Sequence, residues 1–131
     1  MAWQFGGRSP VYKQIVSHIR ADILNGKYKP DEQVPPVRQL AIEAGVNPNT
    51  MQKALADLES EHLFVTRGTV GRFVTSDKAA LDAARETMRK EAVEKILEDA
   101  AALGISREEL ILYLTRTDRD GRQEGGEGAG M

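Results

Sequence analysis

The sequence predicts a mainly α-helical chain with one small β-hairpin, and three observations support this fold class. Residues 36–58 have the pattern of a short helix, a tight glycine turn and a second helix. Residues 63–75 contain two short β-prone runs around a glycine-bearing loop, which is typical of a hairpin. Residues 76–103 contain no Gly or Pro and predict one long helix. Because a hairpin directly after a helix-turn-helix forms a wing, we predict a winged helix-turn-helix followed by further helices.

The local signals of the helix-turn-helix lie around Gly45. Gly45 stands where a helix needs a left-handed residue to end. Asn47 is a good N-cap, and Pro48 occupies the first helical position, where its missing N–H costs nothing. Before this turn a first helix, ended by Asn25 and Gly26, supplies a packing wall. Its apolar stripe contains Val11, Ile15, Ile19 and Ile23.

The second helix of the motif has one apolar side and one polar side. The apolar residues follow the i, i+3, i+4, i+7 spacing and are Met51, Ala54, Leu55 and Leu58. The polar residues gather in the first turns and are Asn49, Thr50, Gln52 and Lys53. Asn and Gln can pair with adenine, and Lys can reach guanine or phosphate, so this side could read base edges in a major groove. The alternative is an ordinary solvated face.

The predicted hairpin favours the DNA-reading interpretation. Helix, turn, helix and wing come in the right order with short joins. The loop carries Arg67 and Arg72 beside two glycines, which allow a close backbone approach. An arginine there suits a phosphate or a narrow minor groove. The alternative is a hairpin whose arginines are merely solvated. The start of the first helix, near Ser9 and Tyr12, is a weaker candidate for a phosphate contact.

Six motifs, in order and with short spacing, resemble the N-terminal domain of GntR-family bacterial transcription regulators. They span roughly residues 9–75 and are segments 10–15, 23–26, 34–41, 45–50, 54–59 and 71–74. The opening Trp3-Gln4-Phe5 and the turn at 47–50 are similar to the YtrA subfamily, whose C-terminal part is short and made of two helices.

The resemblance implies a DNA-binding site at the matching positions. These are Pro36, Arg38, Asn47, Pro48, Asn49, Thr50, Gln52, Lys53, Arg67, Gly68, Thr69, Gly71 and Arg72. Three positions depart from the family pattern. Asp31 replaces the glycine usual after Pro30, so that turn must tolerate another residue. Pro36 replaces a capping serine, and Gln52 replaces a common arginine, so the serine hydroxyl contact is lost and a guanine preference is not implied.

Composition is compatible with this function. The 131 residues carry a net charge of −2, but residues 1–76 hold 9 Lys/Arg and 7 Asp/Glu (+2), whereas residues 77–131 hold 9 and 13 (−4). A mildly basic domain binds DNA weakly as a single copy, which favours a dimer. The chain has no cysteine, no long apolar run and no secretion signal, so we expect no disulfide, no membrane association and a cytoplasmic location.

The second half of the chain has the features of a dimerisation region. Gly104 ends the long helix, Ser106 and Glu109 form a capping box, and a second helix follows to about Thr115. Two such helices have too little interior to bury their own apolar stripes, so a second copy of the pair would complete a four-helix arrangement. The alternative is packing against the chain's own winged domain. The predicted dimer interface is Leu81, Ala84, Met88, Ala92, Ile96, Leu110, Ile111 and Leu114.

These inferences define three regions and one principal function. The regions are a DNA-binding domain (1–76), a two-helix dimerisation region (77–116) and a disordered Gly-rich tail (117–131) without assigned function. We expect a homodimeric, sequence-specific regulator that binds an inverted-repeat operator in double-stranded DNA; repression is what the resemblance implies. The alternatives are a regulator with a small-molecule effector groove at the dimer interface and a protein-interaction module without DNA.

An enzyme is not expected. His18 and His62 are each isolated from any ligand cluster. The sequence contains no phosphate-binding glycine loop, nucleophile elbow or HExxH motif, so we predict no cofactor and no metal.

Overall fold

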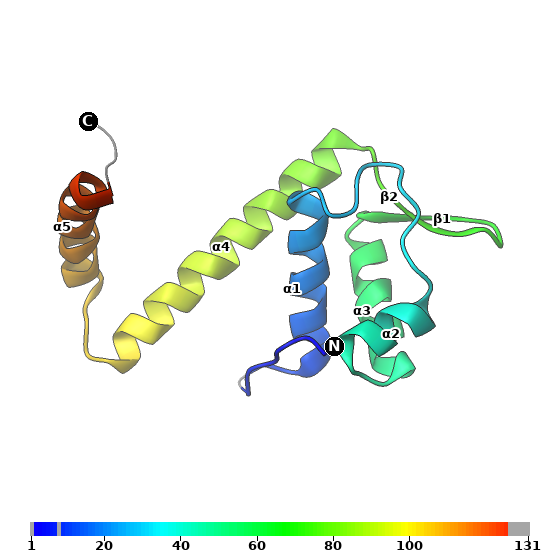
Figure 1. Ribbon diagram of the computed structural model, residues 1–131, viewed down its shortest axis with the longest axis horizontal. Coiled ribbons are helices and arrows are strands. Elements are labelled where there is room, and N and C mark those ends of the chain that lie inside the picture. The colour runs from blue at the N-terminus through cyan, green and yellow to red at the C-terminus, as the bar shows by residue number, and fades with distance from the viewer. Residues whose placement is uncertain (1, 8, 126–131) are drawn as a thin grey trace. The chain divides into compact units, whose positions relative to one another are not determined.

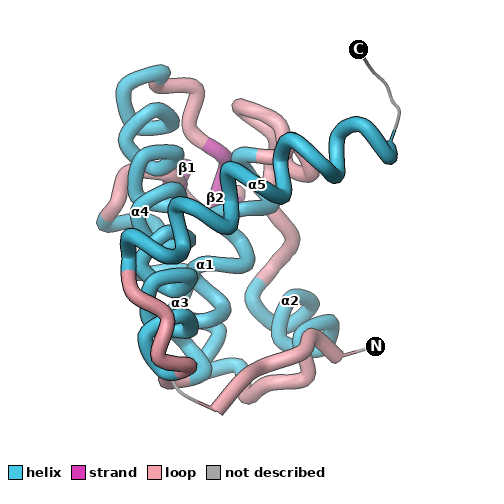
Figure 2. The backbone as a smooth tube through the Cα atoms, turned by 90° about the vertical axis from the view of Figure 1, so that its left-hand side faces the viewer, coloured by secondary structure: helices cyan, strands magenta, loops and turns pink. Residues whose placement is uncertain are grey.

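The computed structural model describes residues 2–7 and 9–125, with side chains up to residue 116. Its elements are α1 (Val11–Leu24), α2 (Val37–Ala44), α3 (Pro48–Ser60), β1 (Phe64–Arg67), β2 (Gly71–Val74), α4 (Lys78–Ala102) and α5 (Arg107–Gly125) (Figure 1). The strands form one two-stranded antiparallel sheet in an otherwise helical backbone (Figure 2). The predicted fold class is confirmed. The chain divides into two compact units, residues 1–89 and 90–131, with the boundary inside α4.

The core of the first unit lies between α1, α2, α3 and the hairpin. α3 packs against both α1 and α2, and its apolar side is fully buried as the periodicity predicted. The largest fully buried side chains are Ile15, Ile19, Leu40, Met51, Leu55, Leu58, Leu63 and Val74. Burial of one side of α3 leaves its opposite side free for another role.

The turn between α2 and α3 has the predicted geometry. Gly45 ends α2 with a φ of 76°, and its N–H donates to the carbonyl of Ala41 at 2.9 Å. The Asn47 side chain accepts a hydrogen bond from the N–H of Asn49 at 2.7 Å, and Pro48 opens α3. These local caps fix where α3 begins.

Gly45→Ala is expected to destabilise the first unit more than Gly26→Ala. Both glycines have a positive φ, 76° and 86°, which costs an L-residue about 1–2 kcal/mol. A Cβ on Gly45 would also lie 2.8 Å from Cβ of Ala2, whereas a Cβ on Gly26 would meet nothing within 4 Å. Urea unfolding of the two variants measures the difference. Equal losses would show that the segment at Ala2 moves aside without cost.

A short segment, residues 31–34, runs along the free edge of β2; we call it the brace. Gln33 forms an isolated antiparallel bridge with Phe73. The N–H of Asp31 donates to the carbonyl of Val74 at 2.8 Å, and the N–H of Val34 donates to that of Arg72 at 3.0 Å. Asp31 has a φ of 68°, so it adopts a left-handed conformation itself, which aspartate tolerates better than most residues.

The part of the second unit whose side chains the structure describes, residues 90–116, has almost no interior of its own. α5 begins with the predicted capping box: the N–H of Ser106 donates to Oε1 of Glu109 at 2.9 Å, and the N–H of Glu109 donates to Oγ of Ser106 at 3.1 Å. Among residues 90–116, only Ala100 is buried. The exposed large apolar residues of this range are Val93, Ile96, Leu103, Ile111, Leu112, Tyr113 and Leu114.

The structure corrects two predictions about the C-terminal half. Ala84 is 4% exposed within the core of the first unit and Leu81 packs against that core, so Ala84 is not available to a partner and Leu81 has its contact within the chain. α5 continues to Gly125 rather than ending near Thr115, so the prediction of a disordered tail from residue 117 is wrong for residues 117–125. Gly121 in the interior of α5 costs a helix only about 1 kcal/mol, Gly125 stands at its end, and no proline interrupts it. Residues 126–131 of the predicted tail lie outside the described residues.

Candidate DNA-binding surface

The start of α3 presents a polar surface to solvent. The side chains of Asn49, Gln52 and Lys53 are exposed, and Thr50 is half-buried at their edge. Met51, which lies among them in sequence, and Ala54, which follows Lys53, are completely buried. Asn47 and Pro48 are exposed at the tip of the same helix. The predicted division of α3 into an apolar and a polar side is therefore present, and the polar side has the donors and acceptors that base edges require.

Lys53 is held by an aromatic ring of α1. Its Nζ lies 3.8 Å from the ring centroid of Tyr12, a close cation–π contact. This contact places the ammonium group at the junction between α1 and α3. Sequence reasoning identified Lys53 but not its partner, because the two residues are far apart in the chain and no local pattern joins them.

Pro36 and Arg38 are exposed at the start of α2. Pro36 is the N-cap of this helix and makes no side-chain capping hydrogen bond. With proline in place of the family's serine, the hydroxyl contact is absent and α2 has no side-chain cap. Arg38 is a cation on the helix that precedes α3.

The two arginines of the hairpin have different environments. Arg67 is exposed; its Nη2 lies 3.1 Å from Oδ1 of Asp31, and its guanidinium carbon lies 4.3 Å from the centroid of the Phe73 ring. Arg72 is only 20% exposed, and its Nε lies 3.2 Å from Oε1 of Glu59 in α3. The expectation that both arginines occupy the loop tip is wrong, because Arg67 is the last residue of β1 and Arg72 lies within β2. The tip itself is formed by the exposed Gly68, Thr69 and Val70, with Gly71 opening β2.

Glu59 connects α3 to both strands of the hairpin. Its carboxylate accepts a hydrogen bond from Oγ1 of Thr66 at 2.6 Å in addition to that from Arg72. The hydrogen bond from Thr66, followed by the interactions with Arg72, lowers the pKa of Glu59. The carboxylate therefore stays ionised at neutral pH and fixes the hairpin against α3. Sequence reasoning included Glu59 in a motif but gave it no role.

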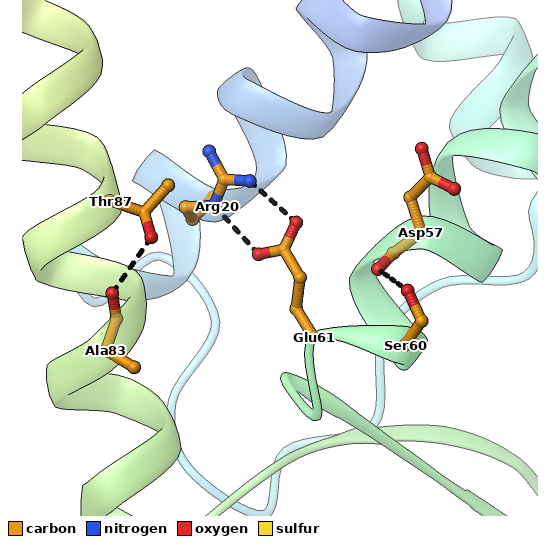
Figure 3. Close-up of polar contacts among 6 residues, drawn as sticks. All are labelled: Arg20, Asp57, Ser60, Glu61, Ala83 and Thr87. Atoms are coloured by element: carbon orange, nitrogen blue, oxygen red, sulfur yellow. Dashed lines mark hydrogen bonds and ion pairs between the residues drawn. The ribbon is translucent and has the colours of Figure 1, made fainter.

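A second carboxylate fixes α1 to the end of α3. Nε and Nη2 of Arg20 donate to Oε1 and Oε2 of Glu61 at 3.1 and 2.7 Å (Figure 3). Arg20 is 4% exposed whereas the side chain of Glu61 is 33% exposed, so removal of Glu61 would leave a buried guanidinium without this partner. The pair holds the frame that positions α3.

The described residues contain no group of three or more His, Cys, Asp or Glu side chains that could hold a metal ion. The ring of His18 stacks on that of Trp3 at 3.8 Å, and Nε2 of His18 lies 3.4 Å from Oδ2 of Asp22. His62 lies in the turn after α3 with a φ of 66°. In the part of the chain that the structure describes, no helix is long and apolar enough to cross a membrane.

A helix-turn-helix with an exposed polar side on its second helix, followed by a hairpin tied to that helix, defines a winged helix-turn-helix DNA-binding protein. Residues 11–74 match the sequence model of the bacterial regulatory proteins of the gntR family. The chain is 32% identical over 113 residues to the HTH-type transcriptional repressor YtrA of Bacillus subtilis (strain 168), covering 86% of this chain and 87% of that protein. The chain belongs to the GntR family of transcription regulators, and its likeness to YtrA is consistent with the YtrA-like subfamily.

Solved structures agree with this assignment. A GntR family transcriptional regulator from Listeria monocytogenes superposes with a TM-score of 0.71 at 32% identity, covering 86% of this chain and 98% of that one. The structure of AraR(DBD) in complex with operator ORX1 matches with a TM-score of 0.51 at 32% identity, covering 55% of this chain and 93% of that one. The protein is therefore a transcription regulator with a DNA-binding domain and not an enzyme.

Proposed function

We propose that the protein is a homodimeric repressor that binds an inverted-repeat operator. In this proposal each subunit inserts the start of α3 into a major groove, and the loop of residues 67–72 lies along the flanking backbone or minor groove. The observation that carries the proposal is the exposed polar side of α3, on a helix whose other side is completely buried. The relative YtrA is described as a repressor, and AraR(DBD) was solved with an operator.

The homodimer is supported by the apolar surface of the second unit. Residues 90–116 expose seven large apolar side chains and bury only Ala100. An apolar surface of this kind is stabilised by association, and a second copy offers a matching surface by symmetry. The proposed interface contains Met88, Ala92, Ile96, Leu110, Ile111 and Leu114. Two-fold symmetry then implies an operator with two inverted half-sites.

Within each half-site, we assign different roles to the outward side chains of α3. Asn49 and Gln52 carry amides that can pair bidentately with adenine, so they would read sequence. Lys53 and Arg38 carry charges that suit phosphates or guanine, so they would contribute mainly to affinity. A winged helix used only as a protein-interaction module would have an apolar outer face on α3, whereas the exposed residues Asn49, Gln52 and Lys53 of this face are polar.

Gln52→Ala and Lys53→Ala are expected to have different effects on DNA binding. The loss of the Gln52 amide should change the preference at one base pair by about 1–3 kcal/mol. The loss of the Lys53 ammonium should weaken binding to all sequences and reduce the dependence of binding on salt. Selection of bound duplexes from a random pool, with the wild type and both variants, measures the base preference together with half-site spacing and symmetry, and titration of binding over a range of salt concentrations measures the effect of Lys53→Ala.

The same selection can contradict the proposal. An unchanged preferred sequence for Gln52→Ala would show that α3 does not read bases through this residue. Selected duplexes without inverted symmetry would exclude the proposed dimeric arrangement. Thermal unfolding of each variant serves as the control for folding. Both substituted side chains are exposed, so Gln52→Ala should leave stability nearly unchanged, and Lys53→Ala should lose only the contact with Tyr12, about 0.5–1 kcal/mol.

A further inference from the structure

We propose that Asp31 limits the affinity of the protein for DNA by occupying Arg67, the exposed arginine of the hairpin. This inference depends on the proposed function, since it assigns a role to a residue beside the DNA-binding surface. Asp31 is an affinity-determining residue in this proposal and makes no contact with DNA itself.

The geometry places the Asp31 carboxylate where a phosphate would compete with it. Oδ1 of Asp31 lies 3.1 Å from Nη2 of Arg67, and both side chains are about half exposed, 58% and 48%. The guanidinium also lies over the Phe73 ring, 4.3 Å from its centroid. The arginine is thus held on one side by the ring and neutralised by one carboxylate, in a position that solvent reaches.

The other arginine of the hairpin cannot substitute for Arg67. Arg72 is mostly buried, and its Nε donates to Glu59, which is also bonded to Thr66. Release of Arg72 would disturb the attachment of the hairpin to α3. Within residues 63–75, Arg67 is therefore the cation best placed to move to a phosphate at low cost.

An exposed ion pair is weak, so a phosphate can displace Asp31 at a modest cost. DNA binding must nevertheless break the ion pair each time. The Asp31 carboxylate also reduces the net positive charge that the hairpin brings to the phosphates. Removal of the Asp31 charge should therefore tighten binding without adding any contact. The gain should be independent of sequence, because phosphate contacts carry no direct base information.

The Asp31 carboxylate can be removed without losing the turn. The hydrogen bond from Asp31 to the Val74 carbonyl uses the backbone N–H. Nε2 of Gln33 separately donates to the carbonyl of Val70 at 2.8 Å, which attaches the brace near the loop tip. Asparagine and glycine both tolerate the φ of 68° at this position. Asp31→Asn and Asp31→Gly should thus preserve the brace.

The test measures binding of the full-length chain to a fluorescein-labelled duplex of random sequence over a range of salt concentrations. For Asp31→Asn and Asp31→Gly we expect binding about two- to fivefold tighter than wild type at low salt. We also expect the slope of log affinity against log salt to steepen by up to about 0.9. The matched control is Asp82→Asn, which makes the same change in net charge but removes an exposed carboxylate of α4 that pairs with Lys78 at 2.8 Å.

A double-mutant cycle assigns the gain to Arg67. In the Arg67→Ala background, Asp31→Asn should have no effect beyond that of Asp82→Asn. A gain that persists without Arg67, or an equal gain for Asp82→Asn, would overturn the inference and indicate a general charge effect. Equal binding by the wild type and by Asp31→Asn would also overturn the inference, while leaving the proposed function intact. No salt-sensitive binding by any variant would overturn both.

Discussion

Leu55→Ala is expected to lower the free energy of unfolding of the first unit by about 2–5 kcal/mol. Leu55 is completely buried on the inner side of α3, the helix that packs against both α1 and α2. Truncation to alanine removes apolar contacts and leaves a cavity that surrounding helices can fill only in part. For a unit of this size, each kcal/mol lowers the midpoint of thermal unfolding by roughly 4–8 °C. Circular dichroism melts measure the shift.

The matched control is Ile42→Ala, which removes a similar side chain from α2. Ile42 is 78% exposed, so its truncation should change stability by no more than about 0.5 kcal/mol. A small loss for Leu55→Ala, or losses of the same size for both variants, would contradict the burial of α3. The orientation of its polar side would then be wrong as well, because the two sides of one helix are fixed together.

Much of the first unit could be predicted because its signals are local. Gly45, Asn47 and Pro48 define the end of one helix and the start of the next through their own backbone preferences. The capping box at Ser106 and Glu109 is local in the same way. The inward side of α3 followed from helical period alone, since apolar residues on one side of a helix are buried together.

Side-chain contacts between distant segments could not be predicted. The two hairpin arginines flank the same loop in sequence, but the strand register separates them. Arg72 lies opposite Thr66, and cross-strand partners share one face of a sheet, here the face toward Glu59. Arg67 is next to Thr66 along β1 and so lies on the other face, where it meets Asp31. Without the register, the sequence gives no reason to treat the two arginines differently.

The long apolar stripe of α4 was also ambiguous. Helical period shows which residues of a helix face the same way, but it does not show which surface they cover. Ala84 covers the core of the first unit, whereas Ile96 remains half exposed in the second. One part of the stripe therefore packs within the first unit, and the other part is exposed and available to the partner chain that we propose.

That remaining surface gives the prediction with the largest effect on DNA binding. Ile111→Asp combined with Leu114→Asp is expected to convert a dimer into a monomer and to weaken binding to an inverted-repeat duplex by about 100-fold or more. The two side chains lie three residues apart on α5 and are 54% and 57% exposed, so they can accept charge without unfolding the chain. Carboxylates buried in an interface without partners strongly oppose association.

Sedimentation velocity measures the oligomeric state, and fluorescence anisotropy measures the affinity. A control for added charge is Ala101→Asp, which adds one acidic side chain to the same unit at an exposed position that helical spacing places opposite Ala92 on α4. A duplex with a single half-site separates the two possible reasons for weaker binding. If dimerisation supplies the affinity, the double variant should lose affinity only for the inverted repeat, because each winged unit retains its own contacts. An equal loss on the single half-site would show that the added charge repels DNA directly, and a variant that remains dimeric would place the interface on other residues.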